Sequence, residues 1–286
     1  MTKVEHHANS TRQAIASAHA GTGLRRFRLG AIDLAEGIGN WRVSHLMGLN
    51  EIRRRYARSS IGQFWVTIST AIMVAALGMV WSTLWRVSLG ELLPFISLSL
   101  ILWGLISGSI ADATTAFAQS APMYLNQGMS FSTAIYALVY RNLLIFAHNV
   151  PIIVVVMILF SIKPGFAALL ALPGIVIMLT ALVWLSYVVA IACVRFRDLV
   201  QVVQSGLLLA FFITPVMWKP DQIPPDKHYL LSLNPFASLL SVVREPLLGQ
   251  IPHLQVWLIA IAFSVGGFVL ALPLIGFCKR RIIYWI

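Results

Sequence analysis

Four arginines are crowded into the stretch N-E-I-R-R-R-Y-A-R-S-S, just before a long uncharged run. A guanidinium group binds phosphate oxygens in pairs, so Arg53, Arg54, Arg55 and Arg58 could hold a phosphate or diphosphate group. Cations beside an apolar run also orient a protein in a membrane, at about 1 kcal/mol each near an anionic leaflet. The two roles are compatible, because such a phosphate group and a lipid headgroup present the same chemistry.

Two charged residues, Asp112 and Arg141, interrupt otherwise apolar runs. Charges at that depth are rare and need a partner. Both lie roughly 10–12 Å from the loop that joins their runs, at 1.5 Å per helical residue. Antiparallel helices would bring them level, so we predict an intramembrane ion pair, with direct substrate contact as the alternative.

A polar stripe continues two turns after Arg141 with His148 and Asn149. The stripe could line a path for a polar substrate, or it could form hydrogen bonds between helices, which contribute about 0.6 kcal/mol on average. Trp65 could stack on sugar rings, or it could belong to an interfacial aromatic belt.

The loop 119–131 carries neither Lys nor Arg and contains several large apolar side chains. Exposed methionine and aromatic residues are typical of a docking surface for a soluble partner. A plain turn is the alternative. The candidate docking residues are Met123, Tyr124, Leu125, Asn126, Gln127 and Met129.

The composition requires a membrane around these residues. The 286-residue chain is 58% hydrophobic and 11% charged, whereas soluble domains are about 45–50% apolar and about 25% charged. Because of this apolar excess, the net charge of +11 indicates a protein that contacts a membrane surface rather than nucleic acid.

Runs of about 20 apolar residues span a bilayer as helices. Six runs qualify: Ile61–Trp85, Leu92–Ala118, Thr133–Phe160, Phe166–Val194, Leu199–Trp218 and Leu254–Cys278.

An even number of spans puts both termini on one side, and fifteen of the 21 lysines and arginines fall on that side. The positive-inside rule makes it cytoplasmic. Residues 1–30 are polar, contain no signal-peptide core, and are expected to be loosely ordered. Residues 59–286 would form the six-span domain.

Residues 31–58 are expected to form an amphipathic helix in the plane of the membrane interface. Its apolar face recurs at helical spacing, and Glu51 can pair with Arg55 one turn on. Between the last two spans, Asn234-Pro235 reads as a helix start. The apolar segment 236–248 is too short to cross, so it predicts a re-entrant or interfacial helix.

No nucleotide-binding loop, dinucleotide fingerprint or zinc-protease motif occurs in the sequence. The two cysteines, Cys193 and Cys278, lack metal-ligand spacing, so we expect no metal site. An enzyme acting on glycans would need clustered acidic or histidine residues. A self-powered secondary transporter would need more intramembrane carboxylates than Asp112.

The chain resembles the permease subunits of ABC-2 type exporters of lipid-linked polysaccharides, such as O-antigen and capsular glycans. Four stretches carry the resemblance, in the same order: E-I-R-R-R-Y-A-R-S-S-I-G-Q-F-W at 51–65, R-N-L-L-I-F-A-H-N at 141–149, R-F-R-D at 195–198 with T-P-V-M-W at 214–218, and L-N-P-F-A-S-L-L-S-V-V-R-E-P-L-L-G at 233–249 with R-R-I-I-Y-W-I at 280–286. The region 121–131 departs from the family by lacking a cation.

The resemblance implies a homodimer of six-span subunits in the bacterial inner membrane. Two copies of a separate ATP-binding subunit would bind ATP and Mg²⁺, so this chain would carry no cofactor and would not itself be an enzyme. Loop 119–131 would couple the ATPase to the permease, and re-entrant helices would gate the outer side. Export of a small lipophilic drug by an ABC-2 permease, and a secondary transporter, are the alternatives.

Overall fold

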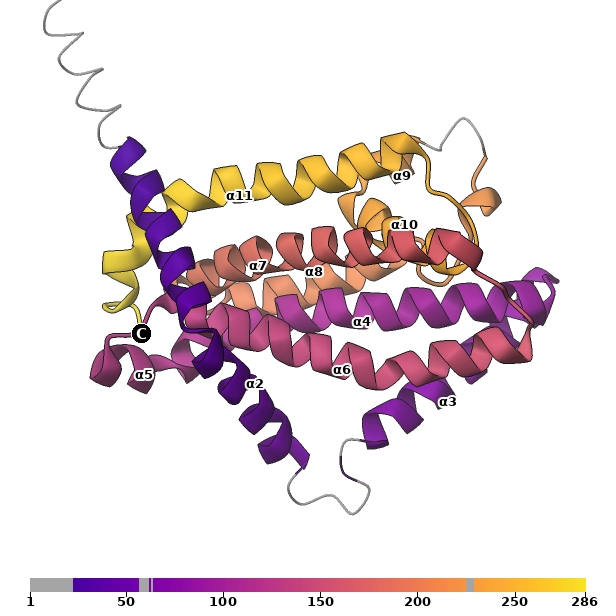
Figure 1. Ribbon diagram of the computed structural model, residues 1–286, viewed down its shortest axis with the longest axis horizontal. Coiled ribbons are helices and arrows are strands. Elements are labelled where there is room, and N and C mark those ends of the chain that lie inside the picture. Colours follow the sequence, from indigo (N-terminus) through magenta and orange to yellow (C-terminus); the bar gives the residue numbers. More distant parts are fainter. Residues whose placement is uncertain (1–22, 57–61, 63, 225–228) are drawn as a thin grey trace, which may run out of the picture.

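The computed structural model describes residues 23–56, 62, 64–224 and 229–286. Within these ranges the regular structure is entirely helical (Figure 1). The predictions that concern residues 1–22, and the roles of Arg58 and of the Arg55 side chain, lie outside the described part of the chain.

Within the described ranges, five helices are long and apolar enough to cross a membrane. At 1.5 Å per residue, their 22 to 31 residues extend over about 33–46 Å. They are α3 (Phe64–Trp85), α4 (Leu89–Gln119), α6 (Phe131–Leu159), α7 (Ala171–Arg195, preceded by the 3₁₀ turn η1, Gly165–Leu170) and α11 (Leu254–Ile282). A multi-pass membrane protein, as expected from the composition, is therefore confirmed.

The long helices are not equivalent. Helix α4 lies at the centre between α6 and α7, and most of it is buried (Figure 1). Helix α3 lies at the edge, and only Val74 and Gly78 are buried along it. The edge helix therefore presents much of its apolar surface to its surroundings.

The sixth expected span differs from the prediction. Helix α8 covers Leu199–Ile213, and the chain leaves the helix at Thr214, whose backbone is extended. Pro215 explains the end, because a proline disfavours helical geometry in the residue before it. With 15 residues, α8 is about 22 Å long, shorter than a hydrocarbon core of about 30 Å.

The segment predicted to lie in the interface forms two helical pieces. Residues 23–39 are helical, a turn occurs at Asn40, and α2 follows at Trp41–Tyr56. This helix pair crosses one end of the bundle diagonally (Figure 1). The first helix of the pair begins at residue 23, so residues 23–30 are helical within the segment 1–30 that is expected to be loosely ordered.

Small residues, together with part of the apolar face, bring the helix pair onto α6. Gly37 and Gly48 are buried, and a Cβ on Gly48 would lie 2.9 Å from the Tyr140 ring. From the predicted apolar face, Leu34 and Ile52 are buried at 8% exposure each, whereas Ile38 is 63% exposed and Trp41 60% exposed. The face is thus divided between the bundle and the surroundings, while the glycines allow close contact between the helices.

The opposite ends of the bundle are built from short helices (Figure 1). Helix α5 (Ala121–Gln127) joins α4 to α6 at one end. At the other end η2 (Pro220–Gln222), α9 (Tyr229–Leu233) and α10 (Pro235–Leu247) connect α8 to α11. The predicted start of α10 is confirmed, since the Asn234 side chain accepts hydrogen bonds from the Phe236 and Ala237 amides at 3.0 and 3.4 Å.

Candidate functional site

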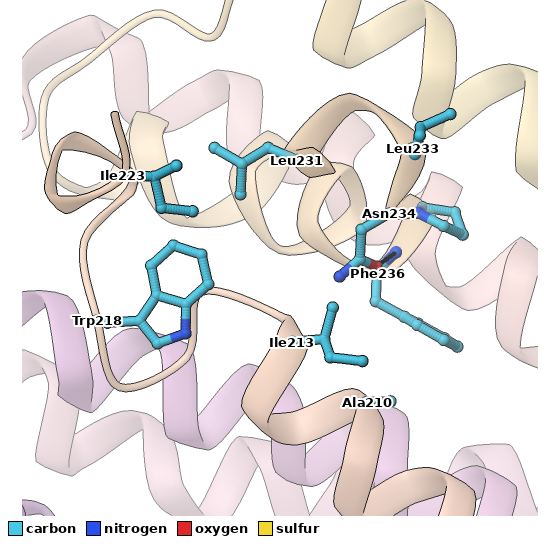
Figure 2. A pocket seen from close by; sticks show the side chains of 9 residues that line it. Ala210, Ile213, Trp218, Ile223, Leu231, Leu233, Asn234 and Phe236 are labelled. Carbon is cyan, nitrogen blue, oxygen red and sulfur yellow. Dashed lines mark hydrogen bonds between the residues drawn. The ribbon is translucent and has the colours of Figure 1, made fainter. Parts of the chain in front are cut away.

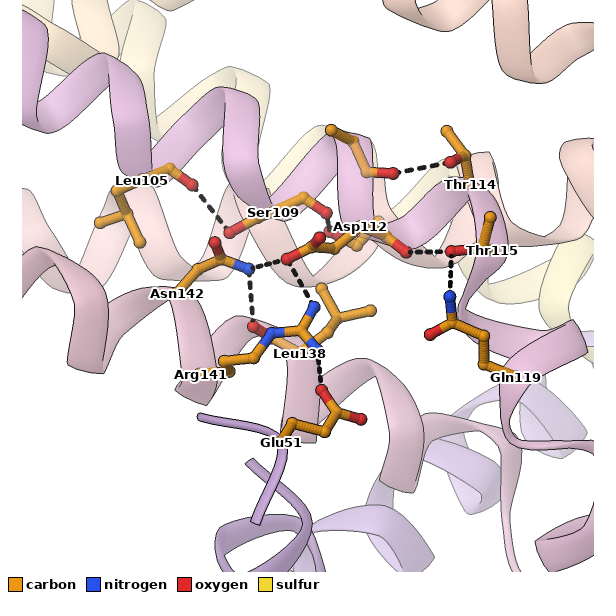
Figure 3. A network of polar contacts seen from close by, with 12 residues as sticks. Glu51, Leu105, Ser109, Asp112, Thr114, Thr115, Gln119, Leu138, Arg141 and Asn142 are labelled. Atoms are coloured by element: carbon orange, nitrogen blue, oxygen red, sulfur yellow. Dashed lines mark hydrogen bonds and ion pairs between the residues drawn. The ribbon is translucent and has the colours of Figure 1, made fainter. Parts of the chain in front are cut away.

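The structure brings Asp112 and Arg141 together, on α4 and α6 (Figure 3). Arg141 Nη2 lies 2.5 Å from Asp112 Oδ2, and Asn142 Nδ2 donates to the same oxygen at 2.8 Å. Arg141 also forms an ion pair with Glu51 on α2. One arginine of α6 therefore contacts both α4 and α2, the second helix of the pair that crosses the bundle.

Glu51 is the member of this network that the sequence does not reveal. Local spacing predicts a pair with Arg55, whose side chain lies outside the described residues, and the structure pairs Glu51 with Arg141, ninety positions away. The Arg141 residue is 8% exposed. Removing one partner of such a buried pair typically costs about 3–5 kcal/mol, because the other charge remains buried.

A second polar cluster centres on Asp33, which is fully buried in the helix of residues 23–39. Its Oδ2 accepts hydrogen bonds from Tyr187 Oη at 2.7 Å and from the Ser132 amide at 3.1 Å. Lys279 Nζ lies 3.1 Å from Oδ1 and donates to Glu36 at 3.0 Å. Asp33 therefore connects the N-terminal helix to α6, α7 and α11.

Sequence reasoning missed the Asp33 cluster because its members come from four separate segments. The usable signal was local: Asp33 shares a helix face with Gly30 and Gly37. A face of small residues indicates close helix contact. A carboxylate on such a face must find a partner across the contact.

The expected coupling loop forms a short helix with distinct inner and outer faces. Leu125 is 60% exposed, and Asn126 and Gln127 are also exposed, whereas Met123 and Met129 are partly buried. Tyr124 points inward, and burial raises the pKa of its hydroxyl well above the usual value. Gly128 ends the helix with φ of +61°, a geometry that favours glycine.

Tyr124 is the start of a continuous aromatic path into the bundle. Its ring lies 4.4 Å from Phe131 and 6.1 Å from Phe117, measured between centroids. Phe117 in turn lies 5.5 Å from Tyr187, the residue that donates to Asp33. Packed rings and one hydrogen bond therefore connect α5 to the N-terminal helix.

The remaining candidates lie apart from the two polar clusters. Arg53 and Arg54 are exposed near the end of α2, and Trp65 is 55% exposed at the start of α3. His148 is partly buried, with Nδ1 2.7 Å from the Leu144 carbonyl oxygen, and Asn149 is buried. Among the described residues, no hydrogen bond or ion pair joins the arginines to Trp65, His148 or Asn149.

A pocket of about 590 Å³ lies at the opposite end, between α8 and the short helices (Figure 2). Trp218 and Phe236 are among its walls. The Asn234 amide nitrogen donates to Thr214 at 2.9 Å, and its oxygen caps α10. Because Asn234 is engaged in this way, the pocket mainly presents apolar surface. The described residues contain no cluster of three or more side chains suited to hold a metal ion.

The architecture defines a class of protein: a multi-pass membrane protein with buried charge networks at one end. Residues 45–248, more than half of the chain, match the family model described as ABC-2 type transporter. The chain belongs to the ABC-2 type transporter family.

Curated relatives share most of its length. One O-antigen export system permease protein RfbA of Klebsiella pneumoniae is 22% identical over 223 residues, which cover 78% of this chain and 85% of that protein. A protein of the same description from Myxococcus xanthus is 24% identical over 193 residues, covering 67% of this chain and 74% of the relative.

Proposed function

We propose that this chain is the permease subunit of an ATP-driven exporter that moves a lipid-linked polysaccharide, such as an O-antigen, across the inner membrane. The family match over residues 45–248 carries the proposal. The relatives described as O-antigen export permeases supply the substrate class. Five apolar helices of spanning length support a transport role.

Energy for export would come from a separate subunit. The sequence contains no phosphate-binding loop, so ATP and Mg²⁺ would bind to two copies of an ATPase on the cytoplasmic side of a permease homodimer. The exposed face of α5, with Leu125, Asn126 and Gln127, supports docking there. The aromatic path from Tyr124 would carry motion of the ATPase into the bundle.

With α5 on the cytoplasmic side, the membrane topology follows. Helix α8, extended by residues 214–218, would make the sixth crossing, and both termini would be cytoplasmic. The helix pair of residues 23–56 would lie at the cytoplasmic interface, while α9 and α10 would form the re-entrant gate on the outer side. Burial of α10 against α7 and α11 supports the gate.

The substrate would contact charged and aromatic residues along the path. Arg53 and Arg54, with Arg55 and Arg58, would bind the lipid diphosphate, because guanidinium groups match phosphate oxygens bidentately. Trp65, His148 and Asn149 would line the route of the glycan. Exposure of Arg53, Arg54 and Trp65 supports these roles.

ATPase activity tests the proposal. The permease is purified in lipid alone and then with its candidate ATP-binding partner, and hydrolysis is measured in both samples. We expect hydrolysis only with the partner, in a complex of two permeases and two ATPases, at a rate that changes when loop 119–131 is altered. The absence of both a complex and hydrolysis would overturn the exporter proposal and favour a secondary transporter.

A further inference from the structure

A pocket of about 470 Å³ lies between the N-terminal helix pair and α6, and none of the charged residues of the two networks lines it. One wall contains Ile38, Trp41 and His45, and the other contains Tyr136, Tyr140 and Leu143. We call this feature the Trp41 pocket.

The local sequence explains why space is present at this point. The helix pair turns at Asn40, between Ile38 and Trp41, so the two pieces do not continue as one straight helix along α6. His45 packs on Tyr140 with ring centroids 4.9 Å apart, and Tyr136 Oη donates to the Leu34 carbonyl at 3.4 Å. The rings on both walls are held in place, so the pocket has rigid aromatic sides.

The depth of the pocket indicates the kind of ligand. Tyr136 to Leu143 lie five to twelve residues after the start of α6, which corresponds to about 8–18 Å. Helix α6 has 29 residues and is about 43 Å long, longer than a hydrocarbon core of about 30 Å, so the pocket lies at the boundary between headgroups and hydrocarbon on the side of α5. A hydrocarbon chain reaches this depth without leaving the membrane.

Positive charge lies at the rim. The exposed guanidinium of Arg42 sits 5.6 Å from the Trp41 ring centroid. The acidic residues on the helix pair have other partners: Asp33 and Glu36 pair with Lys279, and Glu51 pairs with Arg141. Within the described ranges, no carboxylate forms an ion pair with Arg42. The pocket is therefore an apolar slot with a cation at its mouth.

We propose that the Trp41 pocket binds the first isoprenoid units of a polyprenyl diphosphate carrier, with Arg42 on the diphosphate. The branched chain carries flat alkene groups and methyl groups, which pack on the faces of Trp41, Tyr136 and Tyr140. The arginine offers paired donors to phosphate oxygens. This inference rests on the proposed function and assigns to the substrate lipid a site distinct from the arginines at 53–58.

Photolabelling tests the site directly. The permease–ATPase complex in phosphatidylethanolamine nanodiscs is irradiated with a diazirine-bearing polyprenyl diphosphate, and labelled peptides are identified by mass spectrometry. We expect labelling within 37–45 and 136–143, suppressed by unlabelled polyprenyl diphosphate but not by phosphatidylglycerol. Arg42→Ala should weaken labelling about fivefold, as expected for one interfacial cation, and Trp41→Ala should weaken it further.

Matched variants control for general membrane effects. Leu46→Ala removes an exposed apolar residue of α2 that does not line the pocket, and Arg28→Ala removes an exposed cation of the preceding helix. Both should label like the parent protein.

Three results would overturn the pocket assignment: equal competition by phosphatidylglycerol, which would indicate a general lipid site; protection of the pocket by a second copy of the chain; or no labelling there. If export continues in any of these cases, only this inference fails. Loss of the ATPase complex itself would count against the proposed function.

Discussion

The Tyr187 hydroxyl donates a 2.7 Å hydrogen bond to the Asp33 carboxylate, across 154 positions of sequence. Both side chains are fully buried. On one side Tyr187 packs against Phe117, which contacts Tyr124 of α5. On the other side Asp33 pairs with Lys279 of α11. This hydrogen bond therefore connects the aromatic path that begins at α5 to the N-terminal helix.

Tyr187→Phe should lower the free energy of unfolding by about 1.5–3 kcal/mol, since it removes a hydrogen bond to a charged group. It should also reduce export per ATP hydrolysed, because the link between α5 and the N-terminal helix is weakened. Thermal unfolding and the ratio of export to hydrolysis are the measurements. Tyr284→Phe, at a tyrosine that is 86% exposed, is the control. An unchanged ratio in Tyr187→Phe would show that the bond is structural only.

Arg141→Ala should destabilise the protein by about 3–5 kcal/mol, because Asp112 and Glu51 would lose a buried cation. The double variant Asp112→Arg/Arg141→Asp should recover part of that loss, and Arg197→Ala, at an exposed arginine, should cost little. Thermal unfolding in lipid measures all three. If the double variant is no more stable than Asp112→Arg alone or Arg141→Asp alone, the Asp112–Arg141 ion pair is not the main interaction.

Leu125→Asp should abolish binding of the ATPase subunit without unfolding the permease, because the side chain is 60% exposed at the surface of α5. Tyr124→Ala should instead destabilise the fold, by about 3–5 kcal/mol as for other large buried aromatics. Co-purification with the ATPase and thermal unfolding separate the two effects. Leu24→Asp, at a 75% exposed leucine on the N-terminal helix, should retain the ATPase.

Arg244→Lys should loosen the short helix α10. The Arg244 guanidinium is buried, donates to Ser99 Oγ at 2.9 Å and to the Pro215 carbonyl at 2.6 Å, and lies 4.1 Å from the Phe95 ring centroid. A lysine cannot reproduce this planar fork. We expect a lower unfolding temperature and faster hydrogen exchange in 235–247, whereas Lys163→Arg, at an exposed cation, should change neither. Unchanged exchange would show that α10 is held by apolar packing alone.

Gly276→Ala should detach the N-terminal helix from α11. A Cβ at Gly276 would collide with the Arg26 carbonyl and would lie 3.0 Å from the Gly30 amide nitrogen, both in the backbone. Overpacking of this kind costs about 1–3 kcal/mol. Gly266→Ala on the same helix meets nothing within 4 Å and should be neutral or stabilising. Proteolysis of the N-terminal helix measures detachment, and equal resistance in the two variants would contradict the contact.

The spanning helices and the Asp112–Arg141 contact could be predicted because their signals are local. Apolar length determines a span, and depth along two adjacent helices determines which charges become level. The early end of α8 also has a local signal in the sequence, because Pro215 disfavours helical geometry at Thr214. The contacts of Asp33 and Glu51 depend on how separate helices cross. No spacing rule in a single sequence reports that geometry.

The turn at Asn40 divides one long crossing segment into two independently anchored parts. The earlier part is tied to α11 through Lys279 and to α6 and α7 through the hydrogen bonds of Asp33, and the later part is tied to α6 through Arg141. Any movement of the earlier part relative to the later part during a transport cycle would be taken up at this turn. A spectroscopic probe at residue 40 would therefore report the stroke of the transporter without touching either anchor.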